Sequence, residues 1–166
     1  PGGRLPVTFY RSVNDLPPFT DYGMANRTYR FFNGTPLYPF GHGLSYAAFA
    51  YKNVRSSAPQ LRADGTIDVS VDVTNTGKRA GSEVVQLYVQ HMGSKVSRPH
   101  EDLRGYQRVA LDPGQTRTVV MPLSAKSLAY WDSTSHGWVV EDEPVKLRVG
   151  ASSADIRGEV TVDIKR

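Results

Sequence analysis

The chain has 166 residues, a length that accommodates one domain with a hydrophobic core, or one domain with an extension. Hydrophobic residues make up 39% and charged residues 22%, as in ordinary soluble globular proteins, and no stretch approaches the roughly 20 apolar residues of a membrane-spanning helix. The net charge of +4 comes from scattered Lys and Arg, so neither nucleic acid nor a membrane is an expected partner. The absence of cysteine excludes disulfides, thiolate metal sites and a cysteine nucleophile.

The first 51 residues are rich in aromatic side chains and proline. Twelve of the seventeen Phe, Tyr and Trp residues and six of the eleven prolines lie there. The stretch has neither helical nor alternating periodicity, and its prolines block long helices and central strands. Left in water, the rings would form a larger adhesive surface than a soluble monomer normally exposes. Residues 1–65 are therefore predicted to be an extended aromatic arm and linker that needs a partner surface.

From residue 66 onward the pattern predicts β-strands. Apolar and polar residues alternate over 67–73 and over 83–91, where Val85, Leu87 and Val89 share one face of the strand. Further strands are expected near residues 105–111, 115–123, 138–140, 145–149 and 160–164, with turns at 75–77 and 112–114. The inward face of the strand over 115–123 stays open, because Val119 and Val120 compete for it. Ser124 is expected to cap a single helical turn that ends at Leu128.

About seven short strands without a long helix predict an all-β fold. We expect an immunoglobulin or fibronectin type III-like antiparallel sandwich over residues 66–166, preceded by the extended N-terminal arm. The chain opens with Pro1-Gly2-Gly3-Arg4, which lacks an initiator Met and the apolar region of a signal peptide. It is therefore expected to begin inside a longer protein.

Five ordered motifs carry a family resemblance that spans nearly the whole chain. They are GGRLPVTFY (2–10), RTYRFFNGTPLYPFGHGLSY (27–46), VDVTNTGKRAGSEVVQLYV (71–89), RPHEDLRGYQRVALDPGQT (98–116) and WVVEDEPVKLRVGASSADI (138–156). In this order they resemble the C-terminal part of family 3 glycoside hydrolases, the β-glucosidases and β-xylosidases: the end of the α/β sandwich domain, a linker and a fibronectin type III-like domain. One departure is Glu141-Asp142-Glu143-Pro144, where many relatives have a Gly before the next strand.

The resemblance implies that the catalytic residues lie outside this chain. In these enzymes the nucleophilic Asp belongs to an N-terminal barrel and the general acid/base is usually a Glu of the α/β domain. No residue here matches either motif, so we expect no catalytic residue and no cofactor in the chain. The implied role is to brace the upstream barrel and α/β domains of a secreted or periplasmic protein that hydrolyses β-glucosides or β-xylosides.

The possible polar sites of the chain have mostly structural explanations. The acidic clusters at 101–102 and 141–143 fall in predicted loops, where solvated turn carboxylates are expected, with a weak Ca²⁺ contact as the alternative. His42, His91, His100 and His136 lack metal-ligand spacing, so no metal site is expected. Gly41-His42-Gly43 is interpreted as a turn that lets the arm bend closely over its neighbour.

The arm is the one region where a binding function competes with a structural one. Exposed aromatic rings could stack on sugars, although most of them are expected to pack on protein. If sugar contact occurs, the candidate substrate-contacting residues are Tyr29, Arg30, Tyr38 and His42. A carbohydrate-binding module and a general adhesion sandwich therefore remain as alternatives to the accessory role.

Overall fold

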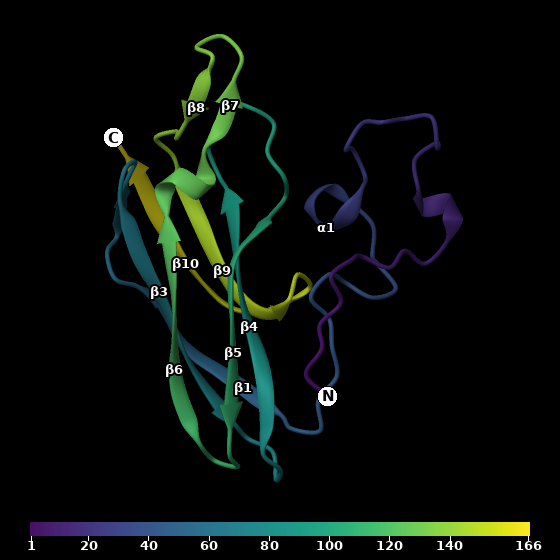
Figure 1. Ribbon diagram of the computed structural model, residues 1–166, viewed down its shortest axis with the longest axis vertical. Coiled ribbons are helices and arrows are strands. Elements are labelled where there is room, and N and C mark those ends of the chain that lie inside the picture. The colour runs from purple at the N-terminus through teal and green to yellow at the C-terminus, as the bar shows by residue number, and fades with distance from the viewer.

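Two β-sheets pack face to face, and an irregular N-terminal segment lies along one of them, in the computed structural model, which describes all of residues 1–166 (Figure 1). One sheet has the strand order β1-β3-β6 and the other β2-β10-β9-β4-β5, while β7 and β8 form a separate hairpin. The strands are β1 (Phe49–Ser56), β2 (Gln60–Arg62), β3 (Thr66–Asn75), β4 (Gly81–His91), β5 (Asp102–Leu111), β6 (Thr116–Ser124), β7 (Tyr130–Asp132), β8 (Gly137–Val139), β9 (Pro144–Ser152) and β10 (Asp155–Lys165). The predicted all-β sandwich is confirmed, with one parallel pair, β2 with β10.

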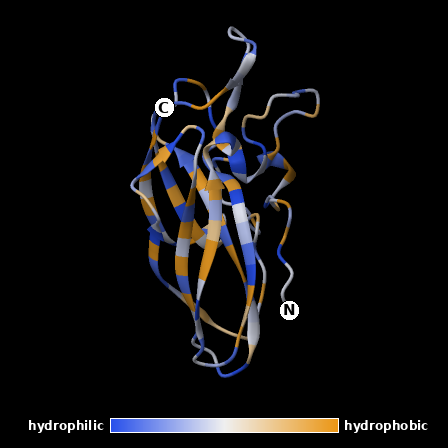
Figure 2. Cartoon of the chain, turned by 60° about the vertical axis from the view of Figure 1, so that its left-hand side comes forward, coloured by the Kyte–Doolittle hydropathy of each residue, from blue (hydrophilic) through white to orange (hydrophobic).

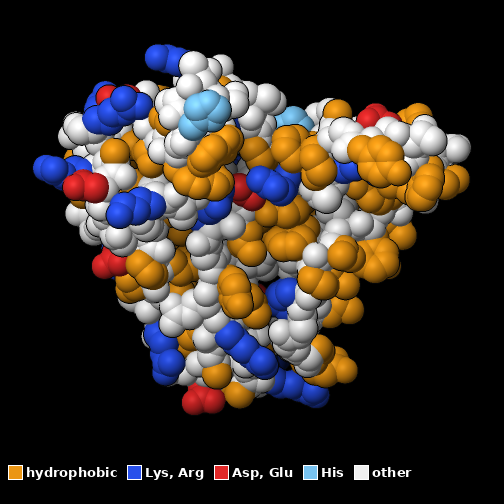
Figure 3. Space-filling model, turned by 45° about the horizontal axis from the view of Figure 1, so that its top comes forward, with side chains coloured by type: hydrophobic (Ala, Val, Ile, Leu, Met, Phe, Trp, Pro, Cys, Tyr) orange, Lys and Arg blue, Asp and Glu red, His pale blue; other side chains and the backbone are white.

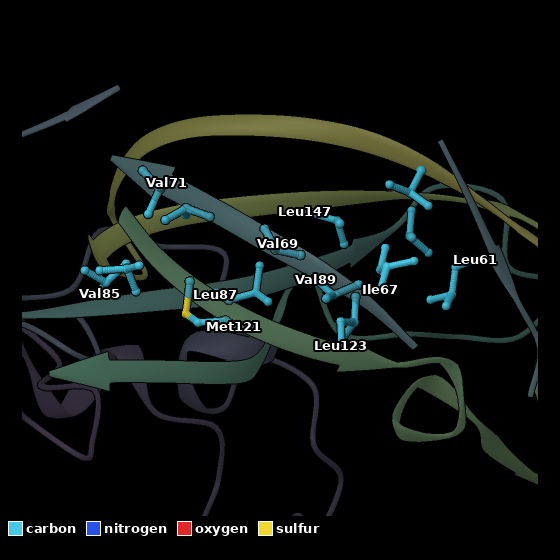
Figure 4. Packing of buried hydrophobic residues seen from close by; sticks show 14 of the residues in the cluster. Leu61, Ile67, Val69, Val71, Val85, Leu87, Val89, Met121, Leu123 and Leu147 are labelled. Atoms are coloured by element: carbon cyan, nitrogen blue, oxygen red, sulfur yellow. The ribbon is translucent and has the colours of Figure 1, made fainter. Parts of the chain in front are cut away.

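The core lies between the two sheets and follows the predicted alternation. In β3, Ile67, Val69, Val71 and Val73 are all buried, and the alternation of apolar and polar residues is visible along the strands in Figure 2. They pack against Val85, Leu87 and Leu147 of the other sheet (Figure 4). The sequence left open which face of β6 points into the core. In the structure, Val119, Met121 and Leu123 are the buried residues of this strand. A contiguous apolar core of this kind holds the two sheets together.

The sandwich begins earlier in the structure than the predicted residue 66. Strand β1 pairs with β3 through Phe49 opposite Asn75 and Tyr51 opposite Val73, and β2 extends the edge of the five-stranded sheet. The alternation of β1 is broken at Asn53, which has a φ of 55° and lies in a register shift. Because of this β-bulge, β1 lacks the regular alternation of apolar and polar residues from which strands were predicted. In the structure, the arm therefore comprises residues 1–48.

The remaining helical elements are one turn long: η1 (Val13–Asp15), α1 (Thr28–Phe31) and η2 (Ala125–Leu128). The turn expected before Leu128 is confirmed as η2, but the predicted side-chain cap by Ser124 is wrong, because that side chain makes no capping hydrogen bond. Instead the Ser127 hydroxyl donates to the Ser124 carbonyl at 2.7 Å. None of these helices is long and apolar enough to cross a membrane.

The strand predicted at 138–140 lies outside the two packed sheets. Residues Gly137–Val139 form β8, which pairs with β7 in a hairpin that projects from one end of the molecule (Figure 1). The Trp138 ring is 70% exposed and meets Trp131 edge to face, with ring centroids 5.8 Å apart. The two tryptophans of the chain thus lie on a projecting element and not in the core.

Candidate functional site

The arm covers the outer face of β4, which the alternation alone would leave in water. Gln86 and Tyr88 point away from the core, yet they are 3% and 0% exposed. The Gln86 side-chain amide donates to the Gly41 carbonyl at 3.1 Å, and the Tyr88 hydroxyl donates to the Gln86 side-chain oxygen at 2.6 Å. Polar groups buried in this way need such partners. The junction between arm and sheet is therefore a specific, hydrogen-bonded interface.

Gly41 fits the predicted close turn of the arm. Its φ is +79°, and a Cβ atom placed there would lie 2.0 Å from the side-chain oxygen of Gln86. No side chain can occupy that space, and a positive φ also favours glycine. Gly41 therefore lets the arm backbone touch the sheet directly.

Tyr29 anchors the middle of the arm to the same sheet. Its ring stacks on Phe40 with centroids 4.3 Å apart and meets Tyr88 edge to face at 5.9 Å. The Tyr29 hydroxyl accepts a hydrogen bond from the Leu103 backbone N–H at 3.0 Å. Burial, reinforced by the nearby Asp102 carboxylate, raises the pKa of Tyr29 despite the Leu103 bond. The ring is thus an internal packing group with a satisfied polar end.

Ion pairs complete the junction. Arg4 pairs with Glu83, and Arg30 pairs with Asp102 at 3.0 Å. Asp102 also accepts from Arg104 at 2.5 Å, so this carboxylate is held between two guanidinium groups. Bidentate and networked pairs of this kind hold geometry better than isolated surface pairs.

The acidic clusters are not the solvated turns that the sequence predicted. Glu101 is 6% exposed and accepts a hydrogen bond from Arg148 at 2.6 Å. Glu143 accepts from the Gly93 backbone N–H at 3.1 Å and lies 2.6 Å from the His91 ring. Only Asp142, whose side chain is 49% exposed, matches the expectation. The prediction is wrong for the others, Asp102 and Glu141 included, because long-range partners bury them.

The four predicted sugar-contacting residues fall into two separate groups. Tyr29 and Arg30 are engaged with the sheet, as described above. Tyr38 and His42 stack on each other with centroids 5.6 Å apart, and Tyr38 also meets Phe9 at 6.1 Å. Both line an open hollow of about 490 Å³ on the arm itself. Tyr29 also lines a separate hollow, at the junction of arm and sheet.

The far side of the arm carries apolar side chains with no partner in this chain. Phe19 is 96% and Tyr22 91% exposed, and hydrophobic side chains gather over the arm in Figure 3. The other exposed ones include Val7, Val13, Leu16, Met24, Leu37, Leu44 and Tyr46. We call this set the outer face of the arm. A patch of this extent on a soluble chain marks an interaction surface.

Several buried acidic side chains are held in ion pairs. The buried carboxylates of Glu101, Asp102 and Glu141 are each paired with an arginine. A retaining glycosidase needs two carboxyl groups about 5–5.5 Å apart across a sugar cleft. No cluster of three or more potential metal ligands is present. The Glu101–Arg148 pair, which sequence reasoning missed, joins residues 47 positions apart in the chain.

The comparisons with known proteins agree with this architecture. A family model described as "Fibronectin type III-like domain" matches residues 83–153. The periplasmic β-glucosidase of Salmonella typhimurium is 38% identical over 95% of this chain, and the xylan 1,4-β-xylosidase of Xylanibacter ruminicola is 38% identical over 93%. The solved β-glucosidase of Kluyveromyces marxianus in complex with glucose superimposes with a TM-score of 0.89 at 34% identity, over 100% of this chain.

These matches define the sandwich as a fibronectin type III-like domain. The chain spans 22% of the Salmonella protein, 18% of the Xylanibacter protein and 22% of the solved Kluyveromyces chain. In its relatives, this region therefore belongs to a much larger protein. Over nearly its whole length the chain is similar to one region of these larger proteins, with the arm and the fibronectin type III-like domain matched together, in agreement with the resemblance to the C-terminal part of family 3 glycoside hydrolases.

Proposed function

We propose that this chain is a non-catalytic accessory region and that its arm braces the catalytic domains of the complete protein. The outer face of the arm carries the proposal. The inner side is fixed to the five-stranded sheet through Tyr29 and Gly41, whereas Phe19 and Tyr22 project into solvent. Burial of one large apolar side chain contributes about 1.5–3 kcal/mol. Contact with an upstream domain would bury several at once.

The loop that carries Phe19 and Tyr22 is held in shape by hydrogen bonds of its own. Its hydrogen bonds stay within the arm: Arg27 donates to the Gly23 carbonyl at 2.9 Å, and Arg11 donates to the Thr35 carbonyl at 3.2 Å. Ser12 and Asp15 form a reciprocal capping box around η1. The loop thus holds a defined shape without any help from the sandwich. A preformed apolar surface loses less entropy on docking than a disordered one.

The activity of the complete protein is inferred from its relatives. Those named above are a β-glucosidase and a β-xylosidase, which supports hydrolysis of β-glucosides or β-xylosides from non-reducing ends by upstream barrel and α/β domains. The periplasmic β-glucosidase supports a secreted or periplasmic location. The 166-residue chain alone is expected to give no turnover of nitrophenyl glucoside or xyloside. Robust turnover by this chain would contradict the accessory role.

The bracing role is tested in the protein that includes the upstream domains. Replacing Phe19 and Tyr22 together by Ser should lower its melting temperature by several degrees and leave that of the 166-residue chain within about 1 °C. Val120→Ser, on β6 of the opposite sheet, is the control, because this side chain is also exposed. Equal melting temperatures for the double variant and the parent in the longer protein would refute the bracing role.

A second candidate function is carbohydrate binding at the Tyr38–His42 hollow. The stacked rings of Tyr38 and His42 beside Phe9 support it, because aromatic faces suit the C–H faces of sugars. It is tested by retention of the chain on immobilised polysaccharide. Tyr38→Ala should abolish retention, whereas Trp131→Ala on the distant hairpin should not. Absence of retention by the unmodified chain would rule out this candidate.

A further inference from the structure

A polar hollow lies where the arm meets the outer face of the five-stranded sheet, over β4 and β9. It encloses about 350 Å³, which is within the range of about 300–1,000 Å³ for small-molecule sites. Both parts of the chain contribute to its wall, including Gln90, Glu101, Arg148 and Ser153 from the sandwich side and Thr8 and Asn33 from the arm. Tyr29 and Phe32 add aromatic surface to the same wall.

The charged part of the wall is a buried pair with capacity for further hydrogen bonds. Arg148 donates through Nη1 to the Glu101 Oε2 atom at 2.6 Å, and the Glu101 side chain is only 7% exposed. The Arg148 Nε atom is buried and has no hydrogen-bond partner, and the Glu159 carboxylate lies 3.8 Å from it. The pair therefore offers a ligand the Glu101 carboxylate as an acceptor and the Arg148 Nε–H as a donor that has no other partner.

The neutral part of the wall also has unused hydrogen-bonding groups. The Thr8 hydroxyl is buried without a partner. The half-buried Gln90 and the exposed Asn33 also line the hollow, and their side chains make no hydrogen bond within the chain. Buried polar atoms without partners are uncommon and costly, at about 1–3 kcal/mol each. Two of them, the Thr8 hydroxyl and the Arg148 Nε atom, lie at this hollow and point to an occupant that both donates and accepts.

We propose that this hollow binds one neutral sugar ring, whose hydroxyl groups pair with Thr8, Gln90 and the Glu101–Arg148 pair. An anion would meet the Glu101 carboxylate, a cation would meet the Arg148 guanidinium, and an apolar molecule would leave the polar atoms unpaired. A hydroxyl suits both members of the pair because it can donate and accept. Tyr29 and Phe32 offer apolar surface to the C–H face of the ring. The inference is independent of the bracing role.

The residues that line the hollow come from both the arm and the sandwich, so a bound ligand would connect these two parts. A ligand that contacts Thr8 on the arm and Gln90 on β4 bridges the two parts of the chain. A bridging ligand stabilises the folded junction by RT ln(1 + [L]/Kd), where [L] is the free ligand concentration. Sugar binding would therefore hold the arm against the sandwich.

The test is a titration of the ¹⁵N-labelled 166-residue chain with D-glucose and with D-xylose, each to about 100 mM, followed by amide chemical shifts. We expect saturable shifts at Asn33, Gln90 and Ser153, with a millimolar dissociation constant, and no shift of the Trp138 indole. Tetrahydropyran, a six-membered ring without hydroxyl groups, should give no saturable shift. Absence of saturable shifts with both sugars, or equal binding of tetrahydropyran, would overturn the proposal.

Two variants locate the site. Thr8→Val and Gln90→Ala each remove one hydrogen-bonding group from the wall and should weaken binding by about threefold to tenfold. Gln107→Ala is the control, because Gln107 is exposed on β5 and does not line the hollow. Thermal unfolding of each variant establishes that it is folded before titration. Binding that neither lining substitution weakens would place the sugar elsewhere and reject this site, without bearing on the bracing role.

Discussion

The hydroxyl of Tyr29 in the arm accepts a hydrogen bond from the backbone N–H of Leu103 in β5, 3.0 Å away. This bond joins two segments that are 74 residues apart in the chain. It lies beside the stack of Tyr29 on Phe40, so the arm is fixed at this point by both packing and a directional contact. One side of the arm thereby packs on the sandwich, and the other side is exposed and can contact a partner.

Tyr29→Phe should weaken this attachment while retaining the ring stack. The buried Leu103 N–H loses its acceptor, which costs about 1–2 kcal/mol. Amide hydrogen exchange of Leu103 should accelerate, with little change at Val71 in the three-stranded sheet. Unchanged exchange at Leu103 would show that the bond contributes nothing to the junction.

Gly41→Ala should be more damaging than Gly114→Ala, although both glycines have positive φ angles, of 79° and 75°. At Gly114 a Cβ atom would meet nothing within 4 Å, so only the backbone strain of about 1 kcal/mol applies. At Gly41 the Cβ would collide with Gln86, and the total loss should be about 2–4 kcal/mol. Urea denaturation of the two variants measures the difference. Equal losses would contradict the close approach of arm and sheet.

Glu101→Gln should change how stability depends on pH. Burial outweighs the neighbouring Arg148 guanidinium and raises the pKa of Glu101 from 4.5 to about 7. The folded chain therefore holds this proton more tightly than the unfolded chain, and its free energy of unfolding falls as pH rises from about 4.5 to 7. In the Glu101→Gln variant, the free energy of unfolding should no longer show this decrease, which is on the order of 2 kcal/mol. Glu159→Gln, whose carboxylate lies near the same arginine, should keep it.

Glu141→Gln should have the opposite pH dependence. Burial acts to raise the pKa of Glu141, but hydrogen bonds from the Ser94 hydroxyl, the Lys95 backbone N–H and Arg98 outweigh it, and the pKa is lowered. The stabilisation is present above the ordinary pKa and is lost as pH falls through the lowered value. The variant should lose about 1–2 kcal/mol at pH 7 and approach the parent near pH 3. Unfolding in urea at both values measures this, and a constant deficit would contradict the assignment.

The period-2 pattern predicted the strands that form the core, because Val69 and Val71 alternate strictly with polar residues. It missed β1, where the bulge at Asn53 breaks the alternation. The pattern also predicted that the outward-facing residues of β4 are exposed to solvent. The burial of Tyr88 depends on an arm whose path no local pattern reveals.

The site was harder to predict than the fold. A glutamate in a loop is usually exposed, so Glu101 was expected to be solvated, yet its partner Arg148 is 47 residues away in the chain. The aromatic character of the arm predicted a need for a partner surface, and one side of the arm packs on the five-stranded sheet. Which side of the arm each ring would occupy was not predictable. Tyr29, one of the sugar-contact candidates, packs on Phe40 with one part of its ring surface and lines the hollow at the junction.

The most direct test of the accessory role is oxidative footprinting of Phe19 and Tyr22, in the 166-residue chain and in the protein that includes the upstream domains. Both rings are almost fully exposed in the chain alone. We predict that their modification rates fall at least severalfold in the longer protein. Equal rates in the two proteins would mean that the outer face of the arm has no partner there, and the bracing role would be abandoned.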